Sequence, residues 1–146
     1  TQISGVDSTD RKTSAKLSSN STLVIKEKLM TDGTETAKTD FTVDLDGENS
    51  SANVISRSVA KDNSYQLFLS RINGNNVCSG HTECDAIIMG NGKVSAVPEI
   101  TANHIDASLI HEAAIGKIAG EQLIKLMTLG LSEQEAEEQI VNGFLK

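Results

Sequence analysis

The 146-residue sequence predicts a mainly β protein that ends in a pair of helices. Three observations predict this fold. Apolar residues recur with a period of two in short segments between residues 23 and 100. Clusters of turn-forming residues separate these segments. From about Glu121 onward, the apolar period becomes that of a helix.

The predicted strands follow one another with short turns between them. Residues 1–20 are polar, which predicts a loose lead-in or a solvent-facing strand. Later segments alternate apolar and polar side chains, as half-buried strands do. They lie at residues 23–25, 41–45, 65–69, 87–89 and 94–97, and close to Ile100. Clusters rich in Gly, Asn and Asp predict turns at residues 31–33, 46–49, 61–63, 73–76 and 90–92.

Strands at intervals of roughly 8–12 residues are typical of a sandwich, a barrel or a solenoid. The chain has three Phe, one Tyr and no Trp. A sandwich core usually contains a buried aromatic residue or two, whereas a β-helix stacks small and β-branched side chains. The composition therefore favours the solenoid, although the strand spacing is irregular and no short repeat motif stands out.

Two helices are predicted at the end of the chain. Gly130 follows the first, where a helix C′ residue belongs, and Ser132 with Glu135 forms a capping box for the second. The apolar stripe of the first helix contains Leu123, Ile124, Met127 and Leu131. That of the second contains Ala136, Ile140, Val141 and Phe144.

Composition excludes several classes of function. With 13 Lys and Arg against 20 Asp and Glu, the net charge of −7 argues against a nucleic-acid partner. The sequence has no run of about 18 apolar residues that would span a membrane. Two cysteines exclude a disulfide-dense scaffold. The chain opens at Thr1 without a signal pattern, so we expect part of a longer, cytoplasmic protein.

The densest group of soft metal ligands is Cys78, His81 and Cys84. Two thiols and an imidazole at three-residue intervals suit zinc, copper or an iron–sulfur cluster. The spacing does not match the paired C-x2-C knuckles of structural zinc sites. The alternative is a strand–turn–strand segment in which one cysteine packs inside and the other groups face solvent. Sequence alone leaves both interpretations open.

His111 and Glu112 form a second candidate site, as a metal site or an acid–base pair. Adjacent residues on a strand point to opposite faces, so both reach one site only if the backbone turns there. Cys84 and His111 could also form a Cys–His hydrolase pair, although nothing around them suggests an oxyanion site. His104 has no partner nearby and is expected to be a surface histidine.

The second half of the chain, from about residue 75 to residue 146, resembles the C-terminal part of the SufB/SufD family of iron–sulfur cluster assembly proteins, and the SufB branch more than the SufD branch. The resemblance rests on an ordered series of motifs: Cys84-Asp85-Ala-Ile-Ile-Met89-Gly90, Pro98, His111-Glu112-Ala113, Lys117-Ile118, Glu121-Gln122-Leu123, Gly130-Leu131-Ser132-Glu133 and Ile140-Val141-Asn142-Gly143-Phe144.

The resemblance implies a right-handed parallel β-helix over residues 1–112 and a small helical domain over residues 113–146. It implies that the helices dock a SufC-like ATPase and that the β-helix pairs with a second SufB- or SufD-like chain. A transient iron–sulfur cluster would form at that interface. The family's scaffold cysteine matches Cys84, and its downstream histidine and glutamate match His111 and Glu112. Thiolate is the favoured ligand of such clusters, and weaker imidazole or carboxylate ligands would let a cluster leave.

Three hypotheses follow. The first is an assembly scaffold that is not itself an enzyme, whose site is Cys84, His111 and Glu112. The second is a SufD-like interaction subunit that binds no cluster. Ile110 favours it, because the family's SufB branch has an acidic residue at this position. The third is a metal-binding or hydrolytic protein that shares the fold, with zinc held by Cys78, His81 and Cys84. Of these three residues, Cys78 and His81 match no ligand of the family.

Overall fold

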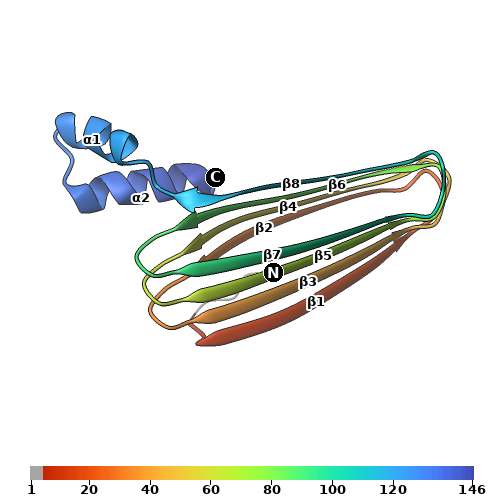
Figure 1. Ribbon diagram of the computed structural model, residues 1–146, viewed down its shortest axis with the longest axis horizontal. Coiled ribbons are helices and arrows are strands. Elements are labelled where there is room, and N and C mark those ends of the chain that lie inside the picture. Colours follow the sequence, from red (N-terminus) through yellow and green to blue (C-terminus); the bar gives the residue numbers. More distant parts are fainter. Residues whose placement is uncertain (1–4) are drawn as a thin grey trace.

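The computed structural model describes residues 5–146, and most of them form a solenoid of two parallel β-sheets (Figure 1). The strands are β1 (Ser8–Leu17), β2 (Thr22–Thr31), β3 (Thr36–Leu45), β4 (Ser50–Ala60), β5 (Tyr65–Gly74), β6 (Cys78–Ile88), β7 (Lys93–Ala102) and β8 (Ala107–Lys117). The helices are α1 (Gly120–Thr128) and α2 (Glu133–Phe144). The predicted mainly β solenoid with two C-terminal helices is confirmed.

The chain alternates between the two sheets. One sheet has the order β1-β3-β5-β7 and the other, which we call the even sheet, has the order β2-β4-β6-β8. Ser8 pairs with Thr36, Thr36 with Tyr65 and Tyr65 with Lys93, so each coil takes 28 or 29 residues. Every coil therefore adds one strand to each sheet and contacts its neighbours in the stack.

The strands are longer and more widely spaced than the sequence predicted. Each has 10 or 11 residues, because each runs the full length of the flattened solenoid (Figure 1). Within residues 1–20, β1 occupies Ser8–Leu17 and is the predicted solvent-facing strand, while residues 1–4 lie outside the described part of the chain. The predicted division into domains at residues 112 and 113 stays a prediction.

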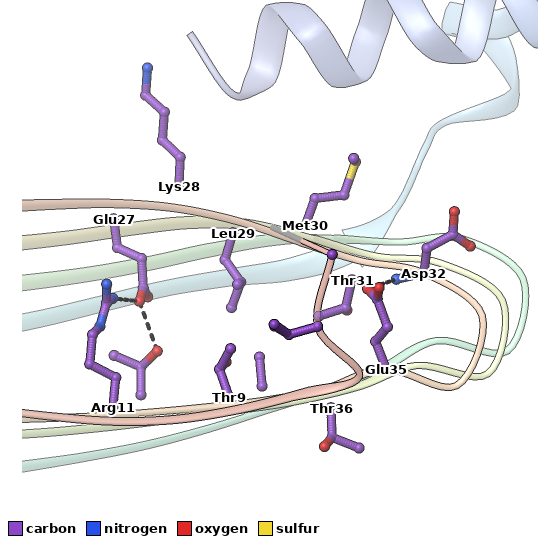
Figure 2. Close-up of a pocket in the computed structure, with 14 residues that line it drawn as sticks. Thr9, Arg11, Glu27, Lys28, Leu29, Met30, Thr31, Asp32, Glu35 and Thr36 are labelled. Atoms are coloured by element: carbon purple, nitrogen blue, oxygen red, sulfur yellow. Dashed lines mark hydrogen bonds and ion pairs between the residues drawn. The ribbon is translucent and has the colours of Figure 1, made fainter. Parts of the chain in front are cut away.

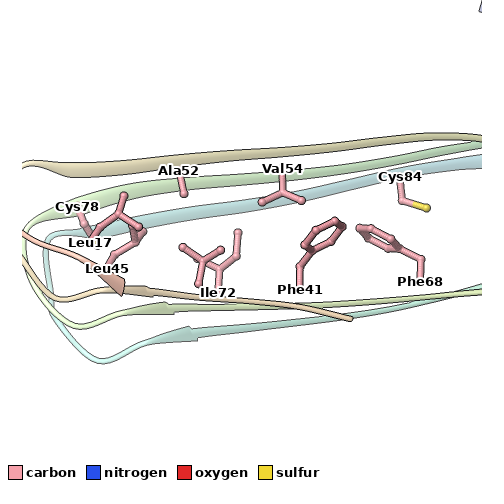
Figure 3. Packing of buried hydrophobic residues seen from close by; sticks show 10 residues of the cluster. Leu17, Phe41, Leu45, Ala52, Val54, Phe68, Ile72, Cys78 and Cys84 are labelled. Carbon is pink, nitrogen blue, oxygen red and sulfur yellow. The ribbon is translucent and has the colours of Figure 1, made fainter. Parts of the chain in front are cut away.

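The core lies between the two sheets and is built from alternate side chains of each strand (Figure 3). Phe41 and Phe68, on β3 and β5, meet edge to face with ring centroids 6.0 Å apart. The remaining buried members are small or branched: Leu17, Val43, Leu45, Ala52, Val54, Ile72, Cys78 and Cys84. This narrow interior suits the low aromatic content of the sequence.

The alternating apolar residues of segment 65–69, namely Tyr65, Leu67 and Leu69, lie on the outer face of the solenoid. On β5 the buried residues are Gln66, Phe68, Ser70, Ile72 and Gly74, whereas Tyr65 is exposed. Both faces of this strand contain apolar residues, so alternation alone did not identify the inner one. The buried Gln66 amide donates to Thr31 Oγ1 and to the Val59 carbonyl, each at 2.9 Å. These two bonds satisfy the amide donors of Gln66, whereas its Oε1 atom is buried without a hydrogen-bond partner among the described residues.

The helical end forms as its local signals predict. Ser132 Oγ accepts a hydrogen bond from the Glu135 N–H, and the Glu135 carboxylate accepts from the Ser132 N–H at 2.8 Å. The Ser132 N–H and hydroxyl, which both donate to the Glu135 carboxylate, lower the pKa of Glu135. Gly130 ends the first helix with a φ of +97°, a conformation that favours glycine. Among residues 5–146, no helix is long and apolar enough to cross a membrane.

Candidate functional site

Cys84 is the most deeply buried of the candidate residues. It lies on β6 with only 1 % of its surface exposed, and its side chain points toward Phe68 in the core (Figure 3). Both cysteines are free thiols. Burial, with smaller effects of the Asp85 and Glu27 charges, raises the pKa of Cys84 to about 11. The thiol is therefore protonated at neutral pH in this conformation.

His111 faces the same interior from the neighbouring strand. It pairs with Thr82 in the ladder between β6 and β8, whereas Cys84 pairs with Ala113. Cys84 and His111 are therefore diagonal neighbours, with Cα atoms roughly 8 Å apart from standard strand spacing. The Nδ1 atom of His111 is buried without a hydrogen-bond partner, and burial lowers the pKa of this imidazole. The structure brings this thiol and imidazole to one face.

Glu112 lies on the opposite face of the even sheet. Strand β8 runs without a break from Ala107 to Lys117, so consecutive residues alternate between the inner and outer faces. On the outer face the Glu112 carboxylate lies 3.2 Å from His81 Nε2. The structure thus separates Glu112 from Cys84 and His111, because the backbone does not turn between residues 111 and 112.

The group Cys78, His81 and Cys84 is also divided. These residues belong to one continuous strand, β6, in place of the strand–turn–strand segment considered from the sequence. Both cysteines are buried on the inner face, whereas His81 is on the outer face. Six residues of extended chain place the two cysteines about 20 Å apart. The three residues do not form a common ligand set in this conformation.

His104 lies in the turn between β7 and β8 and is partly exposed. Its Nδ1 accepts a hydrogen bond from the Asp106 N–H at 3.1 Å and lies 3.9 Å from the Asp106 carboxylate. These contacts are local to the turn.

A buried carboxylate that the sequence analysis did not single out lies in the same interior. Glu27, on β2, forms an ion pair with Arg11 (Figure 2), and it accepts hydrogen bonds from Thr39 Oγ1 and Ser56 Oγ, each at 2.7 Å. The Glu27 side chain is only 4 % exposed. The alternation of β2 could have identified Glu27 from the sequence, because Glu27 lies on the same inner face as Leu23 and Ile25.

This network lines a cavity of about 520 Å³ between β1, β2 and β3. Arg11 also lies over the Phe41 ring, 5.7 Å from its centroid. Along the ladder, Glu27 pairs with Ser56 and Ser56 pairs with Cys84. Glu27 therefore lies at the same level of the solenoid as the Cys84 thiol. Its charge adds a small part of the increase in the pKa of Cys84.

The raised pKa of Cys84 makes the stability of the fold sensitive to alkaline pH. An unfolded thiol with a pKa near 9.0 loses its proton first, while the folded thiol keeps its proton up to about pH 11. The stabilisation of the fold by the protonated Cys84 thiol is therefore complete below pH 9, and it decreases by about 2 kcal/mol as the pH rises to 11. Urea unfolding of the wild type and of Cys84→Ser between pH 7 and 11 measures it. The gap between the two free energies of unfolding should shrink with pH, and parallel curves would contradict the prediction.

Several known proteins are similar to this chain in sequence. The family model described as "SUF system FeS cluster assembly, SufBD core domain" matches residues 4–144. An iron–sulfur cluster assembly SufBD family protein of Methanocaldococcus jannaschii is 39% identical over 112 residues, which are 76% of this chain and 35% of that protein. A SufBD family protein of Pyrococcus horikoshii is 33% identical over 132 residues, 90% of this chain and 40% of that protein.

The similarity extends to a bacterial protein over a shorter stretch of the chain. A SufBD family protein of Staphylococcus saprophyticus is 34% identical over 102 residues, which are 67% of this chain and 22% of that protein. The chain thus spans well under half the length of these three relatives.

Proposed function

The chain belongs to the SufB/SufD family of the SUF system, and from this membership we propose that it is a scaffold component of iron–sulfur cluster assembly. A nascent cluster would form at an interface with a second SufB- or SufD-like chain. The chain would not turn over a substrate itself, and any ATP hydrolysis would belong to a SufC-like partner. The single observation that carries the proposal is a thiol and an unpaired imidazole nitrogen on one inner face.

An interface at the end of the solenoid suits these two residues. Among the described residues, β7 and β8 each pair on one side only and are the last strands of their sheets. Such edges offer free N–H and C=O groups to strands of another chain. His111 is on edge strand β8, and Cys84 is one strand further in. A partner at this edge would therefore lie close to both residues.

Cys84 is proposed as the principal ligand and His111 as an assisting one. A cluster requires a thiolate, whereas the raised pKa keeps this thiol protonated. We therefore propose that β8 moves when the complex rearranges, which would hydrate the thiol and lower its pKa. Glu112 would join only if β8 also turned about its own axis, because it now faces outward beside His81.

The C-terminal helices are proposed as the docking site for the SufC-like ATPase. Helix α1 has no buried residue, and α2 has only Ala136 and Val141. Three large apolar side chains of this region are exposed, namely Ile124, Met127 and Leu129. Apolar residues grouped on an exposed helix are typical of a protein-binding surface. The reduced, free thiols agree with a cytoplasmic location, which we propose with the function.

A SufD-like interaction subunit is the second candidate, and one observation favours it. Cys84 is packed in the hydrophobic cluster and its pKa of about 11 disfavours the thiolate. A cysteine that serves only packing would have these properties. In that case the solenoid edge and the helices would support assembly without a cluster ligand from this chain.

Anaerobic reconstitution with ferrous iron and sulfide tests the proposal. The full-length chain, in complex with a SufC-like ATPase, would be compared as wild type, Cys84→Ser and Cys78→Ser. Cys78→Ser is a matched control, because Cys78 is a free, buried thiol on the same face of the same strand. We expect sulfide-to-iron absorption and bound iron in the wild type and in Cys78→Ser. In Cys84→Ser we expect at least a tenfold loss of bound iron.

The other outcomes are equally informative. A folded wild-type complex without iron would favour the interaction subunit over the scaffold. Equal iron binding in all three proteins would contradict Cys84 as a ligand. Far-ultraviolet circular dichroism and thermal unfolding would show that both serine variants keep the fold.

A further inference from the structure

We propose a second metal site on the outer face of the even sheet, in which His81, Glu83 and Glu112 bind a divalent first-row transition-metal ion. The site is distinct from the buried Cys84, and its existence does not depend on the proposed function. Sequence reasoning did not combine these residues, because Glu112 is 31 residues from His81 and meets His81 and Glu83 only through the pairing of β6 with β8.

The three side chains converge on one point. One ligand atom of each lies within 4.8 Å of a ligand atom of the other two. Two ligands bound to one ion at about 2.1 Å can be at most roughly 4.2 Å apart, so small side-chain rotations would close the site. The His81 side chain is 32% exposed and that of Glu112 is 66% exposed. An ion can therefore reach the group from solvent without opening the core.

Register explains why the carboxylates meet. Glu83 on β6 pairs directly with Glu112 on β8. Like charges directly opposite each other on a sheet face are destabilising. The carboxyl of Asp85, two residues further along the same face of β6, adds to this crowding. Arg57 pairs in register with Asp85, one rung away from the Glu83–Glu112 pair. A divalent cation between the two glutamates would relieve their repulsion.

The imidazole is already oriented for coordination. His81 Nδ1 lies 3.1 Å from Asn53 Oδ1, and His81 Nε2 faces Glu112 at 3.2 Å. With Nδ1–H donating to the Asn53 carbonyl oxygen, the Nε2 lone pair can be given to a metal ion. An imidazole with two carboxylates suits iron(II), zinc, cobalt(II) or manganese(II), whereas magnesium and calcium prefer oxygen ligands alone.

Titration of the full chain with cobalt(II) chloride tests the site. Cobalt(II) held by nitrogen and oxygen ligands gives only weak visible bands, whereas a thiolate ligand adds an intense near-ultraviolet band. We expect one bound ion per chain without the thiolate band. His81→Gln and Glu112→Gln should each weaken binding at least tenfold, and loss of the orienting Asn53 in Asn53→Ala about tenfold.

Matched controls identify the site. His104→Gln removes another partly exposed histidine beside a carboxylate, and Glu99→Gln removes a glutamate on the other sheet. Both variants, and Cys84→Ser, should bind cobalt(II) like the wild type. Equal binding by His81→Gln would overturn the proposal. So would a thiolate band that disappears in Cys84→Ser, because the ion would then occupy the core.

Discussion

Gly47→Ala is expected to lower the free energy of unfolding by about 3 kcal/mol or more, a large effect for the addition of one methyl group. Gly47 lies in the turn between β3 and β4, which stacks on the turn between β1 and β2. A Cβ atom at Gly47 would lie 1.9 Å from the Ser19 backbone nitrogen and 2.1 Å from the Ser18 carbonyl carbon. Neither atom belongs to a side chain that could rotate away.

The expected loss arises because the two coils would have to separate. The Gly47 N–H donates to the Leu17 carbonyl at 3.0 Å, and the Asn20 N–H donates to the Glu48 carbonyl at 2.9 Å. Separation weakens both bonds and the packing of neighbouring strands. Urea unfolding followed by circular dichroism would measure the effect. Gly116→Ala is the control, since a Cβ there meets nothing within 4 Å and its effect should stay below about 1 kcal/mol. Similar midpoints for the two variants would contradict the prediction.

Glu27→Ala is expected to cost about 3 kcal/mol of stability, because it removes a buried carboxylate that pairs with the half-buried Arg11 and accepts hydrogen bonds from two hydroxyls. The substitution leaves Arg11 without its carboxylate and deprives the Thr39 and Ser56 hydroxyls of their acceptor. Groups left unsatisfied in a core cost more than the original bonds contributed. Glu48→Ala, at an exposed position in a turn, should change stability by well under 1 kcal/mol.

A double substitution separates the loss of the charge pair from the loss of packing volume. Arg11→Met together with Glu27→Leu removes both charges, so that neither partner of the half-buried pair is left without the other. We expect the double variant to be more stable than Glu27→Leu alone. Chemical unfolding of the four proteins of this cycle gives the coupling energy directly. A coupling near zero would show that the Arg11–Glu27 pair contributes little.

The features predicted correctly depend mainly on neighbours in sequence. The helix ends follow from Gly130 and from the capping box of Ser132 and Glu135, which act within a few residues. The inner face of β3 was visible because Phe41 alternates with polar residues. On β5 the same reasoning failed to identify the inner face, since Phe68 and its neighbours are apolar on both sides.

Tertiary structure decided which candidate residues lie on the same face of the sheet. The sequence determined a mainly β solenoid, the helical end and the family, because composition, periodicity and motif order are properties of the chain itself. Only the register of β6 with β8 put His111 on the same inner face as Cys84 and Glu112 beside His81 and Glu83. Strand residues that are 28 or 29 positions apart in the chain pair with each other, and this pairing fixes the register. The alternation of side chains along each strand then assigns each one to the core or to solvent.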